Sequence, residues 1–276
     1  MLDILIEWLP TIAALLVTGA CAGILAGLLG VGGGIVIVPV LFLIFQTLGI
    51  TASTAMLVAT GTSLMTIIPT SISSARSHHR RGNVNWLLLK RWLFPMLVGV
   101  FVGSLVATRV SGLVLTAIFG VVAILVAMNM MFRANAPAFK DHLPKLPMQM
   151  GLGTGIGFFS VMMGIGGGTL GVPTMTAFNI DAHRAVGTAA MFGLIIALPG
   201  TLMMLFSATT PLDAPRGTFG AVNLPGFLVI VPMTTLFAPL GVKLGSSLDG
   251  ASLKKTFALF LVLVGSRMLW QTFTAS

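Results

Sequence analysis

The sequence predicts an all-α polytopic membrane protein, built from two inverted repeats of about five helical segments each. Three observations lead to this expectation. The chain of 276 residues is 56% hydrophobic and 8% charged, whereas about a quarter of the residues in a soluble domain are charged. Apolar runs of roughly bilayer-spanning length recur along the whole chain. A glycine motif, GxGGG with a proline five residues after its last glycine, occurs in both halves.

Polar and Gly/Pro breaks divide the chain into ten apolar segments, five on each side of a polar stretch. We expect a first membrane repeat at 1–135, a cytoplasmic linker at 136–147 and a second membrane repeat at 148–276. The ten segments are, in order, Ile4–Leu29, Ile35–Leu48, Thr54–Ser74, Trp86–Val110, Leu113–Phe132, Met148–Met163, Thr169–Ile180, Ala185–Phe206, Leu224–Val242 and Leu253–Phe273.

In the first repeat, the opening segment begins with Asp3 and Glu7 in place of a basic n-region, so we expect a retained span and not a signal peptide. The second segment, Ile35–Leu48, is too short to cross about 30 Å of hydrocarbon at about 1.5 Å per residue. It is therefore expected to be a half-helix. The next three segments are long enough to span, and the basic loop Ala75–Asn85 separates the first two of them.

The second repeat follows the same plan. Thr169–Ile180 is a second short segment directly after the second glycine motif, and three segments of spanning length follow it. The tetrapeptides GNVN at Gly82–Asn85 and GAVN at Gly220–Asn223 are 138 positions apart. The motif residues repeat at a spacing of 134: Gly30, Gly32, Gly33, Gly34 and Pro39 correspond to Gly164, Gly166, Gly167, Gly168 and Pro173.

Because five crossings is an odd number, the second repeat must enter the membrane inverted relative to the first. The positive-inside rule tests this arrangement. With the Ala75–Asn85 loop in the cytoplasm, twelve basic residues lie inside and three outside, against ten and five for two parallel four-span halves. We therefore expect the cytoplasmic membrane, with both termini outside. The inside set is Arg76, Arg80, Arg81, Lys90, Arg91, Arg133, Lys140, Lys145, Arg184, Lys243, Lys254 and Lys255, and the outside set is Arg109, Arg216 and Arg267.

The two glycine motifs are the candidate binding site for a small anion. A chain break at membrane depth is tolerated only where it is buried in protein or lines a wet cavity. Two such breaks at matching places of inverted halves indicate the central site of a transporter. Consecutive glycines let several N–H groups turn toward one ligand, and the positive end of the following half-helix adds to the attraction. The alternative is close helix packing by small residues. The candidate residues are Gly30, Gly32, Gly33, Gly34, Pro39, Gly164, Gly166, Gly167, Gly168 and Pro173.

Hydroxyl side chains in the segment after each motif extend the candidate site to Thr62, Ser63 and Thr188. They could donate to an oxyanion or bond back to a carbonyl one turn earlier. All six carboxylates lie at segment edges or in loops, which disfavours a cation site at mid-membrane. The sequence thus predicts no metal and no cofactor.

Two further residue types have structural interpretations. Cys21 is the single cysteine, so no disulfide forms within the chain, and we expect its side chain to pack. His78 and His79 lie in the basic loop and are expected to be solvated.

The doubled G-x-G-G-G with its proline, the GTS at Gly61–Ser63 and the GTA at Gly187–Ala189 resemble the sulfite exporter TauE/SafE family of membrane transporters. The likeness covers essentially the whole chain. It implies movement of small sulfur-containing anions, such as sulfite, thiosulfate, sulfoacetate or other organosulfonates, across the cytoplasmic membrane. The glycine motifs, with Thr62, Ser63 and Thr188, would then bind the anion. Ala189 stands where the first half has Ser63, so two identical subsites are not expected.

A secondary transporter with alternating access is the first functional hypothesis, and a passive anion channel is the alternative. A membrane enzyme using Ser63 and His183 is disfavoured because one lies in mid-span and the other at the cytoplasmic end. The expected partners are a small anionic substrate and the lipid bilayer. No nucleic acid is expected, because the basic residues form no aromatic-studded face. Gly99, Gly103 and Gly120 could serve internal packing or a homo-oligomer.

Overall fold

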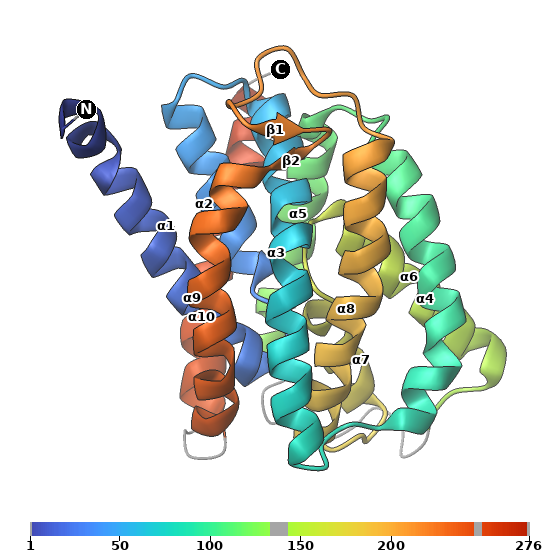
Figure 1. The fold of residues 1–276 in the computed structure, drawn as a ribbon. Coiled ribbons are helices and arrows are strands. Elements are labelled where there is room, and N and C mark those ends of the chain that lie inside the picture. The colour runs from blue at the N-terminus through green and yellow to red at the C-terminus, as the bar shows by residue number, and fades with distance from the viewer. Residues whose placement is uncertain (1, 133–142, 246–249, 275–276) are drawn as a thin grey trace.

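The computed structural model describes residues 2–132, 143–245 and 250–274, and most of this chain is helical. The described parts form a bundle of ten α-helices with one short two-stranded ladder (Figure 1). The elements are α1 (Leu2–Leu29), α2 (Gly34–Thr47), α3 (Ala52–Arg80), α4 (Trp86–Ala107), α5 (Gly112–Phe132), α6 (Leu146–Met162), α7 (Gly168–Ala177), α8 (Ala182–Phe206), β1 (Thr218–Phe219), β2 (Val222–Asn223), α9 (Leu224–Leu244) and α10 (Gly250–Thr274).

The helices confirm the all-α class and the predicted series of segments. Six helices are long and apolar enough to cross a membrane: Leu9–Leu29 of α1, then α3, α4, α5, α8 and α9. The half-helices α2 and α7 have 14 and 10 residues, so they span only about 21 Å and 15 Å. The two-residue strands β1 and β2 were not predicted; they form an antiparallel ladder before α9.

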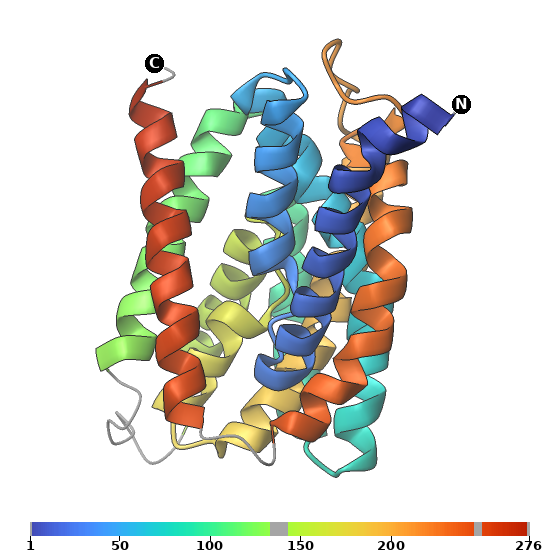
Figure 2. The same ribbon diagram turned by 90° about the vertical axis from the view of Figure 1, so that its left-hand side faces the viewer.

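Two helical hairpins enter the bundle from opposite ends. In Figures 1 and 2, α1 descends from the end that carries both termini, and α2 returns to that end. The pair α6 and α7 enters from the other end and returns there. The glycine motifs form the turns of these two hairpins. Each turn therefore lies inside the bundle and not in a surface loop.

Helices of the first half pack against helices of the second half, in matching pairs. Helix α1 packs along α9 and α6 along α4, while α5 pairs with α10 and α3 with α8. A Cβ on Gly23 of α1 would lie 2.6 Å from the Thr234 carbonyl oxygen of α9. At the corresponding place, Gly157 of α6 lies against the Met96 carbonyl of α4. The inverted repeat remains a prediction, and these contacts are the ones that it requires.

Small residues allow these helix pairs to approach closely. Gly99 and Gly103 of α4 face the backbone of α6 at Thr154 and Phe158, and Gly120 of α5 faces Leu269 of α10. The structure therefore decides between the two roles that the sequence left open for these glycines. They provide internal packing.

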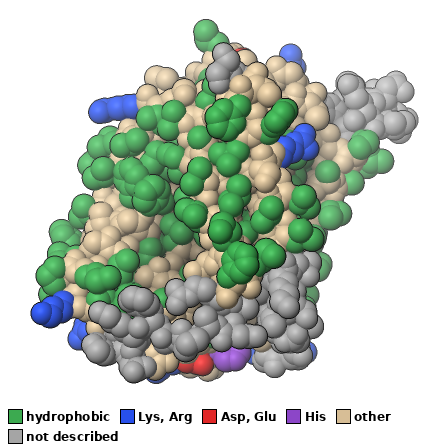
Figure 3. All heavy atoms as spheres, turned by 180° about the vertical axis from the view of Figure 1, so that it is seen from behind, with side chains coloured by type: hydrophobic (Ala, Val, Ile, Leu, Met, Phe, Trp, Pro, Cys, Tyr) green, Lys and Arg blue, Asp and Glu red, His purple; other side chains and the backbone are tan. Residues whose placement is uncertain are grey.

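The outer surface of the bundle is apolar. Large side chains such as Phe94, Phe101 and Leu125 are 69%, 56% and 58% exposed. Figure 3 shows hydrophobic side chains spread over the middle of one face, with Lys and Arg side chains toward its upper and lower margins. A contiguous apolar band of this kind is typical of a surface in contact with lipid.

Helix α3 is longer than predicted and overturns one expectation. It was expected to end at Ser74 and continues to Arg80, with Gly82 at φ 73° just beyond it. His78 is consequently on the helix and only 5% exposed, so its expected place in a solvated loop is wrong. Its Nε2 lies 3.0 Å from the Gly27 carbonyl oxygen of α1. Because a carbonyl only accepts, Nε2 carries the proton.

Cys21 does not pack in the interior. Its side chain is exposed on α1, whereas Gly19 and Gly23 on the same helix face α9. At about 100° per residue, Cys21 lies on the opposite side of the helix from both glycines. The expectation that Cys21 packs is therefore wrong. The face of α1 that carries Gly19 and Gly23 contacts α9, and the thiol lies on the opposite, exposed face.

Asp213 attaches the loop after α8 to the beginning of α3. Its carboxylate accepts hydrogen bonds from the Thr54 hydroxyl at 2.6 Å, the Thr51 hydroxyl at 2.7 Å and the Thr51 amide at 3.2 Å. The bond from the Thr54 hydroxyl, followed by those from Thr51, lowers the pKa of Asp213 below its ordinary value of 3.8. The loop contact is thus strongest when the carboxyl group is ionised.

The Asp213 contact predicts a pH dependence of stability. Because the folded pKa is depressed, the stabilisation is present above the unfolded pKa and is lost as the pH falls through the folded value. At pH 7 we expect Asp213→Asn to melt slightly below the wild type, with the difference shrinking below about pH 4 and vanishing once the pH lies below the folded pKa. Thermal unfolding in detergent from pH 7 to 3 measures this. Melting curves that stay a constant distance apart would exclude the carboxylate as the cause.

Candidate functional site

The first glycine turn joins α1 to α2 with an unusual backbone. Gly30, Gly32 and Gly33 have φ values of 66°, 72° and 78°, a region that side-chain-bearing residues rarely adopt. Within the described part of the chain, the amides of Val31–Ile35 have no hydrogen-bond acceptor. All of these residues are buried. Buried amides without protein partners are rare in folded proteins, and these are donors available to a ligand.

The second glycine turn joins α6 to α7 and has the same property. Gly164 has φ 65°, and the amide of Ile165 is still bonded to the Ser160 carbonyl at 3.0 Å. From Gly166 to Leu170, no acceptor is found for the amides among the described residues. The first turn of α7 therefore opens with a run of free N–H groups, just as α2 does.

The two turns touch each other, main chain against main chain. A Cβ on Gly32 would lie 3.2 Å from Gly166 Cα, and one on Gly166 would lie 2.8 Å from the Val31 carbonyl oxygen. Gly34 meets the Gly164 carbonyl, and Gly168 meets the Gly30 carbonyl. A side chain at Gly34, Gly166 or Gly168 would collide with main-chain atoms of the other turn, and one at Gly32 would be tightly packed against it. The structure thus brings together the two motifs, which are 134 positions apart in the sequence.

Helix α3 passes beside both turns and holds the second one in place. The Ser63 hydroxyl donates to the Gly164 carbonyl at 2.7 Å. Ile67 contacts the first turn, since its Cγ2 would lie 3.2 Å from a Cβ on Gly32. Ala189, the counterpart of Ser63 in the second half, has no hydroxyl, so the Gly30 carbonyl receives no equivalent bond.

Three buried hydroxyls near the second turn have no hydrogen-bond partner among the described residues: Thr60, Ser160 and Thr169. A Cβ on Gly164 would lie 2.8 Å from Thr60 Cα. Thr169 is the first residue after the glycine run, and it lies within the stretch Gly166–Leu170 whose amides have no acceptor among the described residues. A buried hydroxyl left unpaired costs about 1–3 kcal/mol, so these hydroxyls are further donors that a ligand at this place could use.

The arrangement suits an anion. Free amides at the beginning of two half-helices are hydrogen-bond donors that carry the positive end of the helix dipoles. The turns lie within a buried environment of low dielectric, which strengthens such bonds. No group of three or more His, Cys, Asp or Glu side chains that could hold a metal occurs in the described parts of the chain.

Most of the chain matches a known protein family. The family described as "Sulfite exporter TauE/SafE" matches residues 15–268. The chain belongs to the TauE/SafE family. It is therefore a multi-pass membrane transporter and not an enzyme, as predicted.

Individual relatives of this TauE/SafE family member cover nearly its full length. A probable membrane transporter protein of Haemophilus influenzae is 34% identical over 254 residues, covering 92% of this chain and 96% of the relative. One from Methanocaldococcus jannaschii is 28% identical over 265 residues, with 95% and 97% coverage. The probable membrane transporter protein YunE of Bacillus subtilis is 28% identical, with 93% and 97% coverage. No solved structure matches the chain.

The other predicted site residues have roles that the structure makes visible. Thr62 and Thr188 bond back to the Val58 and Arg184 carbonyls, each at 2.6 Å, which was one of the two alternatives. Their hydroxyl oxygens also accept from the other half: Thr62 from the Asn223 amide at 2.8 Å and Thr188 from the Asn85 amide at 2.9 Å. These two reciprocal bonds tie the halves together on either side of the turns. Pro39 and Pro173 lie within α2 and α7.

Thr60 and Thr169 were not among the predicted site residues. These threonines stand opposite Val186 and Ile35 at the spacings of 126 and 134, so the match between the halves does not point to them. Thr169 directly follows the second glycine motif, a signal that the sequence carries, whereas Thr60 is brought to the second turn only by the fold. The site is therefore less symmetric in its side chains than in its backbone.

The Thr62 bond predicts a specific loss of stability. Thr62→Val removes the acceptor of the buried Asn223 amide, which should cost about 1–3 kcal/mol and lower the melting temperature by about 2–4 °C per kcal/mol. Thr66→Val is the matched control, since the Thr66 hydroxyl is recorded only as donating to the Thr62 carbonyl one turn earlier. Thermal unfolding of both variants in detergent gives the comparison. Equal shifts for the two would exclude the tie between the halves as the cause.

Proposed function

We propose that this chain is a secondary transporter of small sulfur-containing anions, such as sulfite, thiosulfate, sulfoacetate or other organosulfonates. The observation that carries the proposal is the pair of buried glycine turns with free amides at Val31–Ile35 and Gly166–Leu170. The substrate oxyanion is the acceptor that these amides lack. Thr60 and Thr169 complete the set of donors, while Thr62, Ser63 and Thr188 hold the helices around them.

The chemistry of the site favours an anion over a cation. The described residues of the turns and of the adjacent stretch of α3 contain no carboxylate, and a membrane cation site normally needs one. The neutral amides and hydroxyls suit a polyatomic oxyanion, which accepts several hydrogen bonds at once. The choice of sulfur rests on the family description, because backbone amides do not distinguish sulfur from phosphorus or carbon.

Alternating access is supported by the position of the turns. They come from hairpins that enter from opposite ends of the bundle (Figures 1 and 2), and they meet in direct main-chain contact. If the halves are inverted repeats, as the reciprocal contacts suggest, rocking one half against the other opens the glycine turns to one side of the membrane at a time. In this arrangement both termini are outside and the basic end of the bundle, with Arg76, Arg80 and Arg184, faces the cytoplasm.

Flux measurements test the function directly. The purified protein in proteoliposomes should take up labelled sulfite or thiosulfate with saturation, and uptake should be accelerated by the same anion on the other side. Thermal-shift screening against sulfite, thiosulfate, sulfonates, sulfate, phosphate and carboxylates should rank the ligands, because binding raises apparent stability. A single-channel current with no saturation would establish the passive channel instead. Absence of any flux for sulfur oxyanions would refute the proposed substrate class.

A further inference from the structure

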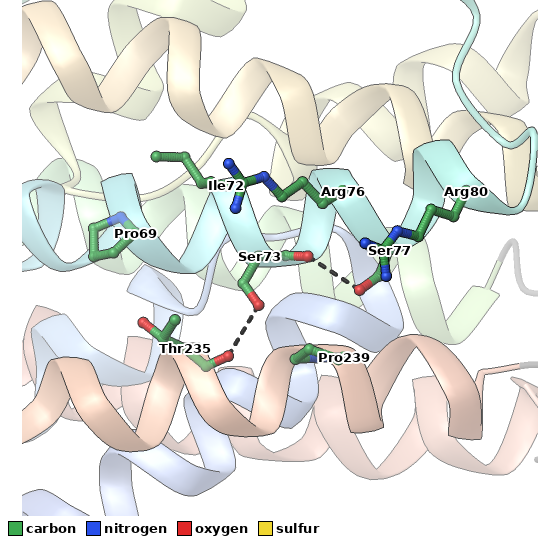
Figure 4. A pocket seen from close by; sticks show the side chains of 8 residues that line it. All are labelled: Pro69, Ile72, Ser73, Arg76, Ser77, Arg80, Thr235 and Pro239. Atoms are coloured by element: carbon green, nitrogen blue, oxygen red, sulfur yellow. Dashed lines mark hydrogen bonds between the residues drawn. The ribbon is translucent and has the colours of Figure 1, made fainter.

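A pocket with an apolar and a basic end lies on the outside of the bundle, between α3 and α9. Its volume is about 400 Å³, and Figure 4 shows the residues that line it. They are Pro69, Ile72, Ser73, Arg76, Ser77 and Arg80 of α3 with Thr235 and Pro239 of α9. The function proposed for the glycine turns makes no use of this pocket.

The pocket is separate from the glycine turns. Ile67 is the residue of α3 that contacts the first turn. At about 100° per residue, Arg76 and Arg80 project about 180° and 220° away from Ile67 around the helix axis. The pocket therefore lies on the face of α3 that is opposite to the turns. A solute held between the turns does not reach it.

The charge of the pocket is positive and uncompensated. Ser73, Arg76, Ser77 and Arg80 form a stripe on one face of α3, at helical spacings of three and four residues. Both arginines are exposed, and neither has an ion-pair partner among the described residues. Each guanidinium offers five N–H donors in a planar fork that fits a phosphate group. The Thr235 hydroxyl is also buried without a partner in the described structure.

The two serine hydroxyls shape the polar end and are already bonded. Ser73 donates to the Thr235 carbonyl at 2.9 Å and Ser77 donates to the Ser73 carbonyl at 3.1 Å (Figure 4). Ser73 thus ties α3 to α9, Ser77 is bonded within α3, and the arginines remain as the donors for a ligand. The pocket is polar at Arg80 and apolar at Pro69, about 16 Å away along the helix.

The surroundings of the pocket are apolar and exposed. Leu236 and Leu240 of α9, next to the lining residues Thr235 and Pro239, are 64% and 47% exposed. In a bilayer such side chains contact acyl chains. The opening is therefore flanked by lipid-facing residues, and the arginines lie at the basic end of the bundle. Clusters of basic residues at this boundary attract anionic lipid headgroups.

We infer that this pocket binds the phosphate headgroup of an anionic phospholipid, held by Arg76 and Arg80. The apolar end of the pocket, at Pro69 and Ile72, receives the beginning of an acyl chain. The lipid spans the seam between α3 and α9, which belong to different halves of the protein. Its binding is independent of whether the glycine turns carry sulfite.

Lipid titration followed by native mass spectrometry tests the inference. The detergent-purified chain should bind dioleoyl-phosphatidylglycerol at least tenfold more tightly than dioleoyl-phosphatidylcholine. The variant Arg76→Gln/Arg80→Gln should lose this preference. Arg76→Lys/Arg80→Lys keeps the charges without the planar fork and should show an intermediate affinity. The control Lys90→Gln/Arg91→Gln removes two exposed basic residues of α4 at the same end of the bundle and should change binding less than twofold.

Three results would overturn the inference. Equal binding of the two lipids by the wild type excludes a headgroup site. An equal loss in the Lys90/Arg91 control shows that diffuse charge, and not the pocket, attracts the lipid. Displacement of phosphatidylglycerol by millimolar glycerol phosphate identifies a soluble anion as the occupant. Melting temperatures measured without lipid establish that each variant is folded before its affinity is compared.

Discussion

Gly32→Ala is expected to reduce anion flux in proteoliposomes about 100-fold, the loss typical of a site displaced by about 1 Å. Gly32 has φ 72°, and an added Cβ would lie 3.2 Å from both Gly166 Cα and Ile67 Cγ2. The methyl group would therefore occupy the contact between the two glycine turns. The left-handed backbone adds about 1–2 kcal/mol of strain for alanine.

Matched variants separate the effect of backbone strain from the effect of the added methyl group at the contact between the turns. Gly82→Ala has the same strain, with φ 73°, but its Cβ meets nothing within 4 Å. It should lose comparable stability and retain flux. Gly166 has no positive φ, and its Cβ would lie 2.8 Å from the Val31 carbonyl oxygen, so Gly166→Ala should lose flux through intrusion alone. If Gly32→Ala transports normally, or Gly82→Ala is equally inactive, the glycine turns are not the site.

Thr60→Val and Thr169→Val are expected to weaken anion binding about tenfold each, the value of one hydrogen bond to a charged ligand. Both hydroxyls are buried and have no partner in the described structure. Their removal should leave the stability of the ligand-free protein unchanged or higher, because an unpaired buried hydroxyl is destabilising. The two effects thus have opposite signs, which a purely structural role would not produce.

Thermal shift with increasing sulfite or thiosulfate measures both effects in one experiment. Thr116→Val is the control, since the buried Thr116 hydroxyl donates to the Gly112 carbonyl at 2.8 Å. It should lose some stability and keep the ligand-induced shift. An undiminished shift in Thr60→Val and Thr169→Val would remove these side chains from the anion site.

Much of the fold could be predicted because it depends on local properties. Length and hydropathy identified the spanning helices, and glycine followed by a short apolar run identified α2 and α7. The main error in a boundary was at α3, which continues through the basic stretch to Arg80. Polar residues there were interpreted as a loop, although Arg and Ser continue a helix that is bonded to α1 at His78 and to α9 at Ser73.

The candidate site was predicted in its backbone and less completely in its side chains. The two glycine motifs were expected to come together, and they do. The sequence does not reveal whether a hydroxyl such as Thr62 is free, because its partner, the Asn223 amide, is 161 positions away. The same reason explains why Thr60 and Thr169 were missed and why His78 was misplaced.

By itself the sequence determined the helical membrane class, the order of the segments and the two places where the chain breaks within the membrane. These follow from hydropathy, segment length and glycine, all of which act over one or two helical turns. Only the tertiary structure decided which amides and hydroxyls lack partners, and which face of α3 carries the arginine pocket. Both depend on neighbours supplied by the other half of the chain, since burial and hydrogen bonding are properties of the packed bundle.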